Sequence, residues 1–221
     1  MKAKVAVIAG TLVDTAMGAE YLNQKDPELE VRAFPATSSP REGQLFQLSS
    51  QENKRRRFTE IFSQAEAEGI RDFFIYCNSL SGVFDFEGFA AERGDRVYTP
   101  LQIYRELGRT FKRSAVIAVN SQSTAGIERS LYENNPEANV IGMGMLDLIS
   151  AVEDKLDPKD IVKDFGLAEL CRFFEINGAD CLILGCTHFP YFRSELEKVT
   201  KLPIINPADL MYEKLLAGLK N

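Results

Sequence analysis

Two of the four cysteines in this 221-residue chain are followed by polar residues at a point where an apolar run ends. Cys77 ends one such run, and the pair Asn78–Ser79 follows it. Cys186 ends another and is followed by Thr187 and His188, the only histidine in the sequence. A thiol at a strand end that precedes a helix lies near backbone N–H groups and the helix dipole, which lower its pKa. The pattern therefore predicts two reactive thiols, with His188 as an adjacent acid or base.

A pair of equivalent thiols suits the inversion of a stereocentre by proton transfer. One thiolate removes a proton from one face of the carbon, and the other thiol supplies a proton to the opposite face. The groups exchange roles in the reverse direction, so a nearly symmetric protein fits the task. An ordinary thiol has a pKa of about 8.5, so each cysteine needs help from a neighbouring group to ionise at neutral pH.

Two other functions are compatible with the same residues. Cys186 with His188 could act as a nucleophile in acyl transfer, although the sequence shows no separate acid to orient the histidine. A two-lobed scaffold could also bind an amino acid without turning it over. The acyl-transfer hypothesis leaves the equivalence with Cys77 unexplained, so stereocentre inversion is the preferred interpretation.

The remaining cysteines are predicted to be packing residues. Cys171 lies in an apolar helix-like stretch and Cys181 within a strand-like run. No cysteine pair has Cys-x-x-Cys spacing and there is one histidine, so we predict no metal site. Four cysteines in a chain of this length do not resemble a disulfide scaffold.

Short apolar and β-branched runs alternate with helix-like stretches along the chain. The predicted strands are Val5–Ala9, Leu29–Phe34, Phe73–Cys77, Arg96–Tyr98, Ala115–Val119, Asn139–Met143, Cys181–Leu184 and Pro203–Ile205. The predicted helices include Gln51–Glu68, Leu101–Phe111, Ile161–Ile176, Tyr191–Val199 and Ala208–Leu219. This alternation predicts an α/β fold with doubly wound parallel sheets.

The chain also resembles itself after a shift of 109 positions. The shift aligns residues 6–9 with 115–118, both of which read Ala-Val-Ile-Ala, and it places Cys77 on Cys186. Self-similarity at a fixed shift indicates a duplicated structural unit.

The duplication predicts two similar α/β lobes related by pseudo-twofold symmetry. The first lobe is residues 1–99, with the C-terminal helix 207–221 packed back on it, and the second is residues 100–206. Because ligands of open parallel sheets bind beyond the carboxyl ends of the strands, we expect the active site in the cleft between the lobes.

The net charge of −6 argues against nucleic acid as a partner. The basic run Lys54–Arg57 is predicted to be a solvated helix face. No apolar run reaches the roughly 18 residues of a membrane span, so we predict no membrane contact and a cytoplasmic protein. Phe84, Phe86 and Phe89 are compatible with a core, a dimer patch or a lid.

The two cysteine segments resemble motifs of one known family. Cys77-Asn78-Ser79 is similar to the Cys-Asn-Thr turn of the cofactor-independent aspartate/glutamate racemase superfamily. Residues 185–190, Gly-Cys-Thr-His-Phe-Pro, are similar to a motif of its glutamate racemase branch. The resemblance implies that one cysteine takes the Cα proton of an amino acid and the other returns one, without pyridoxal phosphate or another cofactor. His188 stands where some aspartate-specific members have Glu, which implies glutamate as substrate; aspartate or another amino acid is the alternative.

The resemblance also assigns roles to further residues. Asp14 would assist Cys77, with a helix N-cap as its alternative role, and Thr15 would contact the substrate. Ser121 and Thr124 lie in a turn similar to one that would bind the substrate carboxylate at a helix start. Further substrate contacts are implied for residues that flank the cysteines: Asn78, Ser79 and Thr187.

The sequence departs from the family pattern at two places. Ala16 and Met17 replace small, flexible residues in the first turn. The segment Pro40–Gly43 lies near the family's Pro-Tyr-Gly loop but lacks the tyrosine, and its Arg41 could pair with a carboxylate or be solvated. A homodimer is compatible with the sequence.

Overall fold

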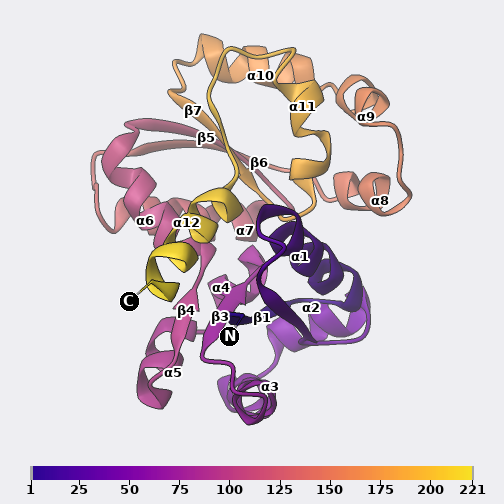
Figure 1. The fold of residues 1–221 in the computed structure, drawn as a ribbon. Helices are drawn as coiled ribbons and strands as arrows, with labels where there is room; N and C mark the ends of the chain where they lie inside the picture. The colour runs from indigo at the N-terminus through magenta and orange to yellow at the C-terminus, as the bar shows by residue number, and fades with distance from the viewer. Residues whose placement is uncertain (1, 221) are drawn as a thin grey trace. The chain divides into compact units, whose positions relative to one another are not determined.

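The computed structural model describes residues 2–220 and contains two four-stranded sheets (Figure 1). All neighbouring strands pair in parallel, and helices connect them. The predicted α/β class with two similar parallel-sheet units is therefore confirmed. Each of the eight predicted strands is present, with ends displaced by no more than two residues.

The first unit comprises residues 2–100 and 208–220. Its strands are β1 (Lys4–Ala9), β2 (Glu30–Pro35), β3 (Asp72–Ile75) and β4 (Arg96–Tyr98), in the order β2-β1-β3-β4. Its helices are α1 (Leu12–Lys25), α2 (Pro40–Leu48), α3 (Gln51–Ala67), α4 (Asn78–Val83), α5 (Phe86–Arg93) and α12 (Pro207–Leu219). The helix α12 joins α1 through Asp209, which accepts a hydrogen bond from Tyr21 Oη at 2.8 Å and pairs with Lys25 at 2.9 Å.

The second unit comprises residues 101–207. Its strands are β5 (Arg113–Ala118), β6 (Asn139–Gly144), β7 (Cys181–Gly185) and β8 (Ile204–Ile205), in the order β6-β5-β7-β8. Its helices are α6 (Pro100–Thr110), α7 (Ser121–Tyr132), α8 (Asp147–Glu153), α9 (Pro158–Asp164), α10 (Leu167–Ile176), the 3₁₀ helix η1 (Phe189–Phe192) and α11 (Arg193–Leu196).

Strand pairing repeats between the sheets at the predicted shift of 109 positions. β1 and β5 begin and end at equivalent residues, as do β2 and β6. Lys4 pairs with Glu30 in the first sheet, and Arg113 pairs with Asn139 in the second. The sequence repeat is therefore a repeat of sheet register.

Turn geometry repeats as well. Gly69 and Gly178, at equivalent positions after α3 and α10, have φ angles of 79° and 72°. Residues with a Cβ rarely adopt this left-handed conformation, so glycine is required at both turns.

Phenylalanines fill much of the core of the first unit. The ring centre of Phe58 lies 4.7 Å from that of Phe84 and 4.6 Å from that of Phe86. The rings of Phe62 and Phe89 are 5.0 Å apart. Because Phe84, Phe86 and Phe89 are all buried, they belong to the core.

Two predicted helices of the second unit are wrong in extent. The stretch Ile161–Ile176 forms α9 and α10, separated at Gly166, whose φ is 62°. Apolar residues of both helices pack into one core, which explains why the pattern resembled a single helix. The stretch Tyr191–Val199 forms the end of η1 and the one-turn helix α11.

The basic run Lys54–Arg57 is only partly a solvated face. Its two middle residues are exposed, but Lys54 is 4% exposed and Arg57 is half-buried. Lys54 lies one helical turn before the buried Phe58 and therefore shares its inward side of α3. The prediction is thus wrong for Lys54 and Arg57.

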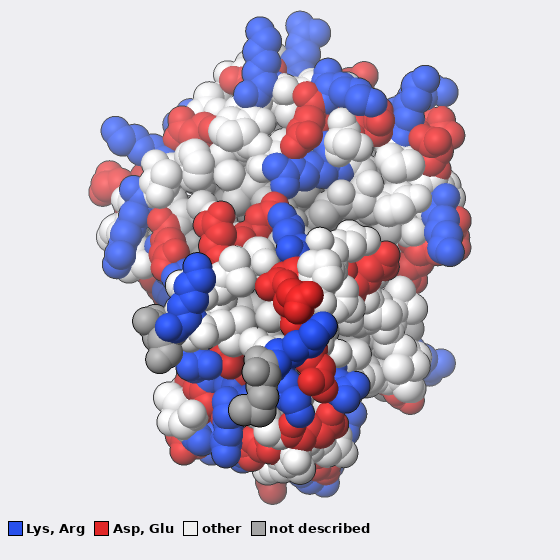
Figure 2. Space-filling view, viewed as in Figure 1, with Lys and Arg blue, Asp and Glu red and all other residues white. Residues whose placement is uncertain are grey.

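On the face shown in Figure 2, acidic and basic side chains are interspersed. Within residues 2–220, no helix combines the length and apolarity needed to span a bilayer.

Candidate active site

Cys77 lies between β3 and α4, and its side chain is buried. Burial, and next the negative charge of Asp14, raise the pKa of Cys77 to about 12. Hydrogen bonds from the backbone amides of Leu80, Ser79 and Gly10 act in the opposite direction and lower the pKa. The prediction of a lowered pKa is therefore wrong for Cys77, because desolvation of the thiolate outweighs the amides.

The carboxylate of Asp14 and the thiol of Cys77 both lie close to Gly10. A Cβ atom at Gly10 would lie 3.1 Å from Asp14 Oδ2 and 3.8 Å from Cys77 Sγ. Asp14 belongs to the first turn of α1, and Thr11 is the N-cap, whose Oγ1 accepts a hydrogen bond from Asp14 N at 3.3 Å. The N-cap interpretation of Asp14 is therefore wrong, and its half-buried carboxylate is placed beside the thiol.

Cys186 directly follows β7, and both it and His188 are buried. Cys186 Sγ lies 3.6 Å from His188 Nδ1, and His188 Nε2 lies 3.3 Å from Glu153 Oε1. In the neutral imidazole, a proton on Nε2 bonds to the carboxylate and leaves Nδ1 to accept the proton of the thiol. The three side chains thus form a hydrogen-bonded chain that ends at the sulfur of Cys186.

Sequence reasoning missed Glu153. It is the last residue of α8 and stands 35 positions before His188, so no local motif connects them. The available signal was chemical, since a buried histidine needs a hydrogen-bond partner on each ring nitrogen. The expectation that no acid orients His188 is therefore wrong.

Thr15 and Thr124 occupy equivalent positions in α1 and α7, and both are buried. Thr15 Oγ1 donates a hydrogen bond to the carbonyl oxygen of Thr11, and Thr124 Oγ1 donates one to Asn120 O at 3.0 Å. Both hydroxyls therefore stabilise the first turn of a helix. Their predicted contact with substrate has no support from these bonds.

The other predicted contact residues are more accessible. Ser121, the first residue of α7, is exposed and follows the N-cap Asn120, whose Oδ1 accepts a hydrogen bond from Ser123 N at 2.8 Å. Three residues beside the cysteines are half-buried: Asn78, Ser79 and Thr187. Each thiol therefore has partly accessible polar residues directly after it in the chain.

The predicted loop at Pro40–Gly43 is instead the first turn of α2. Ser39 is the N-cap, and its Oγ accepts a hydrogen bond from Glu42 N at 3.3 Å. Arg41 is exposed on this turn.

Over residues 2–220, no three histidine, cysteine or carboxylate side chains of the same unit come close enough to share one ion.

The two parallel four-stranded sheets with flanking helices match the fold of solved racemase structures. The Asp/Glu/hydantoin racemase family model matches residues 98–215, more than half of the chain, and the chain belongs to this family.

Individual relatives are more distant. The glutamate racemase of Fusobacterium nucleatum is 28% identical over 116 residues, which are 49% of this chain and 41% of that protein. The match thus spans less than half the length of that relative. The fold is similar to that of a glutamate racemase from Francisella tularensis in complex with D-glutamate, with a TM-score of 0.71, 17% identity, and coverage of 99% of this chain and 80% of that chain. It is also similar to an aspartate racemase homologue from Pyrococcus horikoshii OT3, with a TM-score of 0.71, 16% identity and full coverage of both chains.

Proposed function

We propose that this protein is an amino-acid racemase in which Cys77 and Cys186 are the two bases, glutamate is the substrate and no cofactor takes part. The observation that carries the proposal is the equivalence of the two thiols. Each follows the third strand of its own sheet, and the two stand 109 positions apart in a chain whose sheet register repeats at that shift. Each also has its own acid–base partner, Asp14 in the first unit and His188 in the second.

The raised pKa of Cys77 shapes its part in the reaction. A thiol with a pKa of about 12 does not ionise alone at neutral pH, so it must give its proton to a neighbour, and Asp14 is in place to accept it. The resulting thiolate is a strong base, which favours removal of the weakly acidic Cα proton. The electron pair of the broken C–H bond stays on Cα.

Cys186 completes the reaction from the other face. Its S–H bond breaks, the proton forms the new bond to Cα, and Cys186 is left as a thiolate. The thiolate then regains a proton from solvent through His188 Nδ1, while Asp14 releases to solvent the proton that it took from Cys77. In the opposite direction, His188 Nδ1 takes the proton of Cys186, and Glu153 stabilises the imidazolium that forms. This mechanism requires both sulfur atoms to flank the same Cα.

The substrate assignment combines two arguments. The family shows the reaction class, and glutamate racemases are among the relatives in sequence and fold. His188 favours glutamate over aspartate through the motif resemblance given above. Asn78, Ser79, Thr187 and Ser121 supply polar groups for the carboxylate and ammonium of an amino acid. A homodimer and a cytoplasmic location stay predictions of the sequence.

The test uses single variants Cys77→Ser and Cys186→Ser in deuterated water. Each enantiomer of glutamate and aspartate is followed by polarimetry and by deuterium incorporation at Cα. We expect loss of racemisation in both variants, with residual exchange confined to opposite enantiomers. Cys171→Ala, which removes a buried thiol of α10 outside the two cysteine turns, is the control and keeps activity. Full activity of either serine variant would refute the two-base mechanism.

Acyl transfer at Cys186 is a second candidate, because Glu153 supplies the orienting acid that a Cys–His pair needs. Incubation with amino-acid esters and amides, followed by intact-mass measurement, tests it. A covalent adduct on Cys186 that forms and turns over would favour acyl transfer. We expect no adduct, because acyl transfer gives Cys77 no role.

A further inference from the structure

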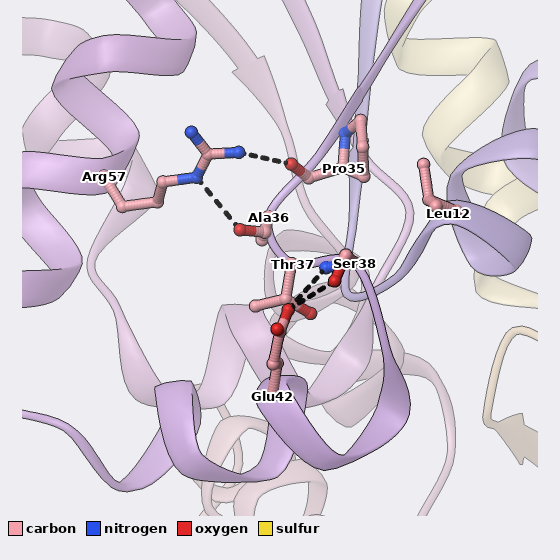
Figure 3. Close-up of a pocket in the computed structure, with 7 residues that line it drawn as sticks. All are labelled: Leu12, Pro35, Ala36, Thr37, Ser38, Glu42 and Arg57. Atoms are coloured by element: carbon pink, nitrogen blue, oxygen red, sulfur yellow. Dashed lines mark hydrogen bonds between the residues drawn. The ribbon is translucent and has the colours of Figure 1, made fainter.

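A pocket of about 340 Å³ lies in the first unit, beside the turn that follows β2 (Figure 3). Residues 35–38 form one of its walls, and charged side chains hold this wall from two different helices. Arg57 reaches it from α3, and Glu42 reaches it from α2.

The two charged residues bind complementary groups of the turn. Arg57 donates from Nε to the carbonyl oxygen of Ala36 and from Nη2 to that of Pro35, both at 2.9 Å (Figure 3). Glu42 Oε2 accepts from Ser38 N at 3.0 Å and from Ser38 Oγ at 2.6 Å. The guanidinium therefore binds the carbonyl oxygens at the start of the turn, and the carboxylate binds the N–H and O–H groups of Ser38 at its end. The turn is thus restrained at both ends.

Thr37, between these contacts, connects the turn to the catalytic cysteine. Its backbone N and its Oγ1 both donate to the carbonyl oxygen of Gly10, at 3.0 and 2.7 Å. Gly10 in turn lies against the sulfur of Cys77, since a Cβ atom at Gly10 would lie 3.8 Å from Sγ, and its backbone amide lowers the pKa of the thiol. A series of hydrogen bonds, linked by the backbone of residues 35–37 and of Gly10, thus runs from Arg57 to the side of Cys77.

This series is specific to the first unit. Both units share the bond that extends the strand pairing, from Ala36 N to Ala9 O in one and from Met145 N to Ala118 O in the other. At a shift of 109 positions, the residues that would complete the series are replaced: Gly166 stands for Arg57, Leu146 for Thr37 and Ala151 for Glu42. The contacts that restrain the turn 35–38 are therefore present only in the first unit, near Cys77, and have no counterpart at the equivalent positions near Cys186.

We propose that Arg57 is a positioning residue for Cys77, which acts through Thr37 and the backbone of Gly10. By holding the turn 35–38, it keeps the Gly10 amide against the sulfur and so favours the thiolate at the moment it forms. The consequence for catalysis rests on the proposed function, whereas the effect on the thiol does not.

The first experiment measures the thiol without any assay of turnover. Iodoacetamide modification of Cys77 and Cys186 is followed by peptide mass spectrometry in the full chain, and the ratio of the two rates is compared between variants. Arg57→Met and Thr37→Val should each lower the Cys77 to Cys186 ratio by about three- to tenfold, the effect of losing one typical intramolecular hydrogen bond. The double variant should fall no further than Thr37→Val alone, because both act on one route. Thr37→Ser, which keeps the hydroxyl, and Arg56→Met, on the exposed side of α3, should keep the ratio of the unchanged chain.

An unchanged or increased ratio in Arg57→Met, or additive effects in the double variant, would overturn the proposal. Circular dichroism confirms that each compared variant is folded.

The second experiment tests the consequence for racemisation. With Cα-deuterated glutamate, Arg57→Met should increase the primary isotope effect for the enantiomer whose proton Cys77 removes, and not for the other. If Arg57→Met has the same isotope effects as the unchanged chain for both enantiomers, the proposed effect of Arg57 on racemisation is wrong. If the chain does not racemise amino acids at all, the alkylation ratios still test whether Arg57 positions Cys77. A failure of the proposed function can therefore be distinguished from a failure of the positioning role.

Discussion

Glu153 Oε1 lies 3.3 Å from Nε2 of His188, and this contact orients the only histidine of the chain toward Cys186. The other ring nitrogen then faces the sulfur at 3.6 Å. The first unit has no histidine at its thiol, and the carboxylate of Asp14 lies near that thiol instead. The two halves of a duplicated scaffold therefore hold different acid–base groups near equivalent thiols.

Substitution Glu153→Gln keeps the shape of this contact but removes the charge that stabilises an imidazolium. We expect kcat for racemisation to fall by about 10- to 100-fold, with a much smaller change in KM, because the loss concerns proton transfer. The initial rates by circular dichroism at saturating and limiting glutamate measure both constants. The neighbouring exposed Asp154→Asn is the control, and equal loss in both variants would contradict a specific role.

Substitution Asp14→Asn separates two effects of one carboxylate. Removing its negative charge lowers the pKa of Cys77, since Asp14 contributes to the increase, so iodoacetamide should modify Cys77 several-fold faster at a given pH. Racemisation should nevertheless fall by about 100-fold, because the proton acceptor is lost. Parallel measurement of alkylation and turnover checks this opposite response. A rise in both would show that Asp14 acts only through its charge.

Stability should decrease above about pH 8.5. Burial raises the pKa of Cys171 and of Cys181 to about 11, whereas an unfolded thiol titrates near 8.5. The unfolded chain therefore loses protons first, and the free energy of unfolding falls as pH rises from the unfolded toward the folded pKa. At about pH 9.5 each cysteine should contribute a loss of about 1 kcal/mol. Urea unfolding at about pH 7.5 and 9.5 measures the loss, and it should shrink in Cys171→Ala and Cys181→Ala.

Two helical glycines of the second unit should respond to alanine in opposite ways. A Cβ at Gly108 in α6 would overlap the carbonyl oxygen of Leu131, so Gly108→Ala should destabilise the fold by about 1–3 kcal/mol. Gly126 in α7 has open space around the same position, so Gly126→Ala should stabilise the fold by about 0.5–1 kcal/mol. Thermal unfolding of the two variants tests the pair, and a shift of the same sign in both would contradict this account.

The strands and the repeat were predictable from local patterns. Apolar runs such as Val5–Ala9 are buried on both faces of a parallel sheet. Such a strand needs apolar side chains at consecutive positions, which can be recognised in the sequence. The repeat of 109 positions was visible because equivalent strands and turns need the same residue types. The turns at Gly69 and Gly178, for example, both have a positive φ angle that favours glycine. Helix breaks were harder, since Gly166 interrupts a stretch whose apolar residues serve one core.

Residue types and their spacing in the chain determined the α/β class, the duplicated units and the two cysteine turns, because each depends on neighbours in sequence. Only the tertiary structure decided that Glu153 meets His188, that Arg57 reaches the turn at Ala36, and that burial raises the pKa of Cys77. These three facts depend on which distant groups fold together and on how much water remains around them. Desolvation and long-range hydrogen bonding have no signature in a short stretch of sequence, so the chemistry of each thiol emerges only with the folded chain.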